Sequence, residues 1–133
     1  GRRLSYCAAT VGNPHCVVRV ERAKRSDAEA FGPAIEVDPR FPNRTNVQFM
    51  ELVDRKTIRI EIWELGAGYT LASGSSACAS AAVAHRLGLV DEEVTVRMVG
   101  GDLSVTIRAD GLEMCGPVRA VAFGRVSVDV FGS

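Results

Sequence analysis

The residues best suited to chemistry gather around one glycine-rich segment, residues 66–76. It ends in Gly74-Ser75-Ser76 and leads into an alanine-rich stretch that we expect to be helical. The first N–H groups of a helix have no partner within it, and together with the helix dipole they attract an anion. The sequence therefore predicts a carboxylate or phosphate site at the N–H groups of Gly74, Ser75 and Ser76. The structural alternative is that the serines only cap the helix.

Two further segments carry polar side chains in settings typical of turns. The first is Gly12-Asn13-Pro14-His15, in which proline biases Asn13 to extended geometry and His15 can change its charge near neutral pH. The second, residues 41–46, ends in Asn46 ahead of an expected strand. Taken singly, each is equally well explained as a turn that precedes a strand.

Apolar and polar side chains alternate through much of the chain, which predicts strands with one buried face. The expected strands cover residues 16–20, 46–53, 58–62, 94–98, 103–107 and 126–130. Gly100-Gly101 and Asp110-Gly111 are typical of hairpin turns between such strands. The pattern indicates a mostly antiparallel sheet.

Two segments depart from this alternation. Residues 26–29 have the form of a capping box and predict a short helix that ends at Gly32-Pro33. Residues 75–89 are apolar around nearly the whole helical circumference, which is typical of a buried helix. We therefore expect an α+β fold, a mostly antiparallel sheet wrapped like a barrel around one central helix, with residues 1–133 in a single domain.

Composition narrows the class of protein. The 133 residues carry 16 basic and 16 acidic side chains, so the net charge lacks the bias typical of nucleic-acid or membrane-surface binding. There is no apolar run of bilayer length and no secretory signal, and the four cysteines form no C-x-x-C pair, which favours a reduced, cytoplasmic protein. A zinc site of His15, Cys16 and Cys115 is an alternative, although its spacing departs from the common patterns. We expect no metal.

In order and spacing, these segments resemble the C-terminal half of diaminopimelate epimerase. The resemblance rests on Gly-Asn-Pro-His at 12–15, Phe-Pro-x-x-x-Asn at 41–46, and Glu-x-Gly-Ala-Gly-x-Thr-x-Ala-x-Gly at 64–74 ahead of the alanine-rich helix. Gly-Gly-x-Leu at 100–103, Gly-Pro at 116–117 and Phe-Gly at 123–124 are similar to the closing strands of that family. The resemblance extends over essentially the whole chain.

The resemblance implies an isomerase, an amino-acid epimerase or racemase that works without pyridoxal phosphate or any other cofactor, as in lysine biosynthesis. Enzymes of this family invert the α-carbon with two cysteines on opposite faces of the substrate, a thiolate base and a thiol acid. Two similar domains, each a sheet around a central helix, supply one cysteine each. The α-carboxylate of the substrate lies at helix N-termini in the cleft between them.

Carried over position by position, the resemblance assigns seven residues to the site. Two asparagines bind substrate, two backbone N–H groups receive the carboxylate, and a His–Glu pair assists the cysteines and holds the α-amino group. The substrate-binding positions are Asn13, Asn46, Gly74 and Ser75, and the catalytic positions are His15, Glu64 and Ser73.

Three departures from the family pattern bear on function. Ser73 stands at the position of the catalytic cysteine, Leu65 at that of an arginine that grips the distal carboxylate, and Tyr69 at a usually acidic position. A serine hydroxyl needs an adjacent base, for which His15 is the candidate. The alternatives are a deliberate Cys-to-Ser change, a one-base isomerase or dehydratase, and a non-catalytic paralogue that binds an amino acid or carboxylate. The departures at Leu65 and Tyr69 favour a substrate whose apolar or aromatic side chain faces these two residues.

Members of that family also have an N-terminal half with its own cysteine, which this chain lacks. The expected partners are therefore a small-molecule amino acid together with either the missing N-terminal half-domain or a second copy in a homodimer. Either partner would complete the cleft. No nucleic acid or membrane is expected as a partner.

Overall fold

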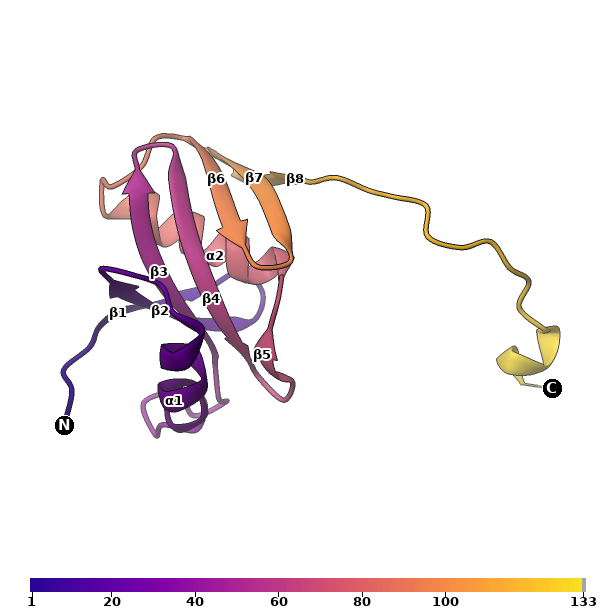
Figure 1. Ribbon diagram of the computed structural model, residues 1–133, viewed down its shortest axis with the longest axis horizontal. Coiled ribbons are helices and arrows are strands. Elements are labelled where there is room, and N and C mark those ends of the chain that lie inside the picture. Colours follow the sequence, from indigo (N-terminus) through magenta and orange to yellow (C-terminus); the bar gives the residue numbers. More distant parts are fainter. Residues whose placement is uncertain (133) are drawn as a thin grey trace.

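The computed structural model of the chain describes residues 1–132 and consists of one sheet with a helix on each face, followed by an extended segment (Figure 1). The strands are β1 (Ser5–Thr10), β2 (Pro14–Val20), β3 (Asn46–Asp54), β4 (Thr57–Glu64), β5 (Gly68–Thr70), β6 (Glu93–Met98), β7 (Gly101–Arg108) and β8 (Gly111–Cys115). The helices are α1 (Arg25–Glu36), α2 (Gly74–Arg86) and the short 3-10 helix η1 (Val128–Phe131).

The strands lie in the order β1-β2-β3-β4-β6-β7-β8, with β5 paired to β4. The pairs β2–β3 and β4–β6 are parallel, and the other five pairs are antiparallel. Parallel neighbours need a crossover connection, and the two helices provide it: α1 joins β2 to β3, and α2 lies on the path from β4 to β6. The prediction of a mostly antiparallel sheet is confirmed, and the parallel joins explain why both helices are present.

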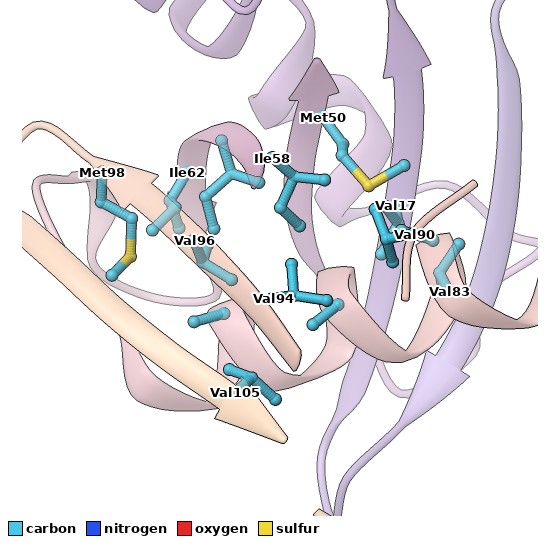
Figure 2. Close-up of a cluster of buried hydrophobic side chains, with 14 residues drawn as sticks. Val17, Met50, Ile58, Ile62, Val83, Val90, Val94, Val96, Met98 and Val105 are labelled. Carbon is cyan, nitrogen blue, oxygen red and sulfur yellow. The ribbon is translucent and has the colours of Figure 1, made fainter. Parts of the chain in front are cut away.

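The sheet curls as a half-barrel around α2, which contacts seven of the strands. The alanines at 77, 79, 81 and 84 are fully buried, and their small side chains let the strands approach the helix closely. Apolar side chains from α2 and from the concave face of the sheet form one core (Figure 2). The predicted buried helix over residues 75–89 is thus confirmed as a helix over 74–86. Cys78 and Ala82 are half-buried, since a half-barrel leaves one side of the helix uncovered.

α1 packs on the opposite face of the sheet, against a second core that includes Phe49. The predicted capping box at residues 26–29 is wrong, because the helix starts at Arg25 and its N-cap, Lys24, makes no side-chain cap. The predicted stop at Gly32-Pro33 is also wrong, because the helix runs through both residues to Glu36. Gly32 is buried directly against Trp63 and Pro33 faces solvent, so packing of the buried face outweighs the cost of an internal proline.

The C-terminal segment, residues 116–132, extends away from the sheet (Figure 1). The predicted strand over 126–130 is wrong: residues 128–131 form η1, and Val126, Val128 and Val130 are 68–79% exposed. Alternation yields a strand only where one face is buried and a neighbouring strand pairs with the backbone, and neither condition is met here. In the described chain, no helix is both long enough and apolar enough to cross a membrane.

Candidate active site

The site begins where β2 starts, because the parallel register of β2 and β3 sets His15 beside Asn46. The Asn46 Nδ2 donates to the Pro14 carbonyl oxygen at 3.0 Å, and its Oδ1 accepts from the N–H of Leu65 at 2.8 Å. One buried amide therefore ties the start of β2 to the end of β4, where Glu64 lies. Both polar atoms of the Asn46 side chain are engaged with backbone groups, so its observed role is to join these two segments.

His15 is 1% exposed, and each ring nitrogen has a side-chain partner. Nε2 lies 2.9 Å from Oδ1 of Asn13, and Nδ1 lies 2.9 Å from Nε2 of Gln48. Burial lowers the pKa of His15. His15 is therefore neutral at pH 7, with the exposed Asn13 on one side and the buried Gln48 on the other.

The N-terminus of α2 combines a cap with free donors. Ser73 is the N-cap, and its Oγ accepts from the N–H of Ser76 and lies 3.3 Å from Oγ of Ser75. Within residues 1–132, the N–H groups of Gly74 and Ser75 have no protein acceptor. The capping function and the anion-binding potential therefore coexist, because capping satisfies only part of the helix end.

Packing around this helix end comes from β6, β7 and β8. A Cβ added to Gly74 would lie 3.0 Å from both Sδ and Cε of Met114, so a side chain there would have to displace the flexible end of the methionine. The N–H of Gly100, in the turn between β6 and β7, donates to the Leu71 carbonyl oxygen at 2.8 Å. Met98 Sδ accepts from the N–H of Ser73 at 3.5 Å. These contacts fix the loop that enters α2.

A chain of hydrogen bonds joins the two halves of the site. Gln48 Nε2, which contacts His15, also donates to Oγ of Ser76 at 2.9 Å. Through Ser76 the chain reaches Ser73 and then Ser75. Three elements, β2, β3 and α2, are thereby connected from Asn13 to the helix N-terminus. The sequence prediction did not include Gln48, whose only signal was a polar side chain among the apolar residues of β3. The N–H of Ser76, which was expected at the anion site, donates instead to Oγ of Ser73.

The glycine-rich turn after β4 is held from the other face of the sheet by Glu36, the last residue of α1. Its carboxylate accepts from Trp63 Nε1 at 2.8 Å and from the N–H of Gly66 at 3.3 Å, and it pairs with Arg44 at 3.3 Å. Glu36 is almost fully buried, so these three donors satisfy a carboxylate that would otherwise be costly to bury. The end of α1 thus fixes the turn and the loop that leads to Asn46.

With this geometry in place, comparison with known proteins identifies the family. The sequence profile of diaminopimelate epimerase matches residues 7–121. The chain belongs to the diaminopimelate epimerase family. It is 53% identical over 129 residues to diaminopimelate epimerase 2 of Nostoc sp. strain PCC 7120, a match that covers 96% of this chain and 45% of the relative. It is 43% identical to the diaminopimelate epimerase of Stutzerimonas stutzeri, over 95% of this chain and 46% of the relative.

The chain therefore spans a little under half the length of these epimerase-family relatives. Among solved structures, a phenazine biosynthesis protein of the PhzF family from Bacillus anthracis superposes with a TM-score of 0.60 at 16% identity, covering 82% of this chain and 38% of that one. A PhzF-family protein from Enterococcus faecalis gives a TM-score of 0.57 at 20% identity, covering 80% and 39%. At these identities the likeness concerns the fold, and it confirms the α+β architecture.

Leu65 and Tyr69, two positions that depart from the family pattern, have different surroundings in the structure. Leu65 is half-buried beside Asn46, to which its N–H donates. Tyr69 pairs with Trp63 in the β4–β5 register, and its hydroxyl donates to Glu61 at 2.6 Å. The Tyr69 ring belongs to the core beneath α1, with Arg25 4.5 Å from its centroid. The expectation that Tyr69 faces a substrate is therefore wrong, because its side chain lies on the sheet face opposite α2.

Cys16 and Cys78 do not substitute for Ser73 in this member of the epimerase family. Cys16 packs in the core beneath α1, and burial raises its thiol pKa to about 12. Cys78 lies farther along α2, and burial raises its pKa as well. As consecutive strand residues, His15 and Cys16 point to opposite faces, which excludes a shared zinc ion. Among residues 1–132 no group of three or more His, Cys, Asp or Glu side chains is arranged to hold a metal.

Proposed function

We propose that this chain is one half of an amino-acid epimerase or racemase that works without pyridoxal phosphate, and that the α-carboxylate of the substrate docks at the N-terminus of α2. The observation that carries the proposal is the connected site: a neutral, buried His15 joined through hydrogen bonds to a helix end with two free N–H groups. A carboxylate placed there would accept from Gly74 and Ser75 and be stabilised by the helix dipole.

The proposed chemistry follows from that position. Removal of the Cα proton leaves a carbanion whose charge spreads into the carboxylate, where the two N–H groups stabilise it. We propose that Glu64, at the end of β4, holds the α-amino group, and that His15, linked to the helix end through Gln48, borders the substrate together with Asn13. Inversion requires one group to take the proton and a second, on the opposite face, to return one. This half supplies only one face.

Ser73 limits the proton transfer that this half of the site can carry out. Its Oγ already accepts from a backbone N–H, and the residues that contact it are other serines and a methionine rather than a base. A serine in that setting stays protonated at neutral pH. We propose that Ser73 positions the helix end and that any proton acceptor comes from the other half of the site.

The other half is either an N-terminal half-domain or a second copy of this chain. The apolar segment 116–131 supports the need for such a partner. Within it Val118, Val121 and Phe123 are at least 95% exposed, far beyond what an isolated domain usually leaves in water. The length of the Nostoc relative, of which this chain matches 45%, favours the half-domain.

Deuterium exchange tests the proposal. The chain is co-expressed with the portion of the Nostoc relative that it does not match, and a panel of L- and D-amino acids is incubated in D2O and followed by mass spectrometry. We expect Cα deuteration of at least one amino acid, increased roughly 100-fold by Ser73→Cys, because a thiol is a far stronger acid than an alcohol. Ser80→Ala, which alters a buried serine elsewhere in α2, is the control. Absence of exchange with both the parent and Ser73→Cys would contradict the proposal.

A second candidate, a non-catalytic carboxylate-binding domain, is favoured by the capping role of Ser73. It predicts calorimetric binding of an amino acid, no exchange, and no gain from Ser73→Cys. Both candidates share the binding site, which Ser75→Pro tests: proline is tolerated in the first helical turn but lacks the N–H. We expect Ser75→Pro to lose binding and Ser75→Ala, which keeps the N–H, to retain it.

A further inference from the structure

Gln48 is a buried polar side chain beside His15 that has no part in the proposed chemistry. It lies near the start of β3, is fully buried, and has its amide nitrogen 2.9 Å from both Nδ1 of His15 and Oγ of Ser76. A primary amide nitrogen has two N–H groups and no acceptor capacity, so each N–H serves one of these contacts. Gln48 therefore hydrogen-bonds both to His15 in β2 and to Ser76 in the first turn of α2.

This contact determines where the proton of His15 resides. Because the amide nitrogen can only donate, Nδ1 of His15 must accept and is unprotonated. The single proton of the neutral ring is then on Nε2, which donates to Oδ1 of Asn13 at 2.9 Å. Nδ1 faces the buried side and Nε2 faces the exposed turn that holds Asn13.

The unpaired oxygen of Gln48 supports this orientation of the amide. Within residues 1–132, Oε1 of Gln48 is buried without a hydrogen-bond partner. Rotating the amide by half a turn would pair the oxygen but leave the NH2 group, with two donors, buried and unsatisfied. Buried donors without partners are rarer in proteins than underused carbonyl oxygens. The observed arrangement is therefore the less costly of the two.

We propose that Gln48 is a positioning residue that fixes His15 in its Nε2–H tautomer, so that His15 presents a hydrogen-bond donor, and not a basic lone pair, on the exposed side of the site. The tautomer stands on the geometry alone, whereas its consequence for a substrate rests on the proposed function. The consequence is that His15 donates to an anionic or carbonyl oxygen of a bound amino acid and does not act as the base for Ser73. This argues against the one-base alternative in which His15 takes the proton.

Nitrogen-15 NMR of the labelled chain tests the tautomer without any substrate. We expect a downfield, unprotonated resonance for Nδ1 of His15 and an upfield, protonated one for Nε2. In Gln48→Glu the new carboxylate accepts where the amide donated, so the proton should move to Nδ1 and the pKa of His15 should rise. In Gln48→Leu the preference for one tautomer should weaken. Ser80→Ala is the matched control, since it removes a buried hydroxyl of α2 that has no partner in the described chain.

A protonated Nδ1 in the parent chain, or the same tautomer in the parent and in Gln48→Glu, would overturn the inference. The measurement on the parent chain shows which ring nitrogen of His15 is protonated even if a variant does not fold. The dispersion of the amide resonances shows whether each variant has folded. These results are independent of deuterium exchange. An epimerase with the Nδ1–H tautomer would refute only the role of Gln48, and an Nε2–H tautomer in a chain without exchange would refute only the proposed function.

Discussion

A histidine that is buried in its neutral form makes the fold sensitive to acid. Burial lowers the pKa of His15, so the folded chain takes up a proton less readily than the unfolded chain, whose histidine titrates near its ordinary value of about 6.5. Between the two values the unfolded state binds more protons. The contribution of His15 to stability is therefore complete above this range, declines as the pH falls through it, and does not decline further below it.

We expect the free energy of unfolding to fall as the pH is lowered from 7 to 5.5, with a slope of up to about 1.4 kcal/mol per pH unit from His15. The measurement is urea denaturation in a His85→Gln background, which leaves His15 as the sole histidine. Adding His15→Gln should remove the slope. An equal slope in both proteins would show that the acid sensitivity has another origin.

At the scale of single residues, the sequence indicated part of the site. Residue type and spacing pointed to His15 and Asn46, the family resemblance pointed to Ser73, and the structure brings these segments together. A glutamine within an apolar strand marks Gln48 as unusual, but its contact with His15 could not be predicted without the register of β2 against β3. Tyr69 was misjudged because only the pairing with β4 shows which face it occupies.

Among the elements, α1 shows most clearly how packing overrides local preference. Glycine is a poor helix former and proline a worse one, yet α1 passes through Gly32 and Pro33. The reason for Gly32 is its contact with β4: an added Cβ would lie 2.4 Å from Cγ and 2.6 Å from Cβ of Trp63. Those atoms are near the backbone and cannot move aside easily. The glycine therefore sets how closely α1 approaches the sheet.

Gly32→Ala is expected to destabilise the protein by about 1–3 kcal/mol, although alanine is the better helix former, because overpacking outweighs propensity. Chemical denaturation measures the change, and Trp63 provides the fluorescence signal. The control on the exposed side of the same helix is Ala30→Gly, which should cost only about 1 kcal/mol. A stabilising Gly32→Ala would mean that α1 does not pack on Trp63 in solution.

The sequence predicted elements well where their periodicity is tied to burial. Strands β4, β6 and β7 alternate because one face meets the core, and α2 is apolar all round because the sheet surrounds most of it. The same alternation failed over residues 126–130, where no strand pairs with the segment. Strand order is also not encoded locally, so the parallel joins of β2 to β3 and β4 to β6 could not be foreseen.

For the whole molecule, the contrast between the half-barrel and the segment 116–132 is the main feature. The half-barrel has a continuous core, whereas the segment leaves the sheet after β8 and its apolar side chains are exposed (Figure 1). Phe123, for example, is 96% exposed. Such side chains add little to the stability of the domain that carries them, and they promote association with any apolar surface. The two parts should therefore be separable by truncation.

Removing residues 118–133 should leave the free energy of unfolding of the half-barrel within about 0.5 kcal/mol of the full chain, because the side chains of residues 118–132 are exposed and do not pack on it. Binding of an apolar fluorescent dye and concentration-dependent association should both fall. The control is Met114→Ala in β8, which removes a contact with Gly74 and should destabilise the domain although its position is only four residues earlier. A truncation that costs more than about 1 kcal/mol would show that the segment folds back onto the half-barrel in solution, and exposed apolar surface would then no longer argue for a missing partner.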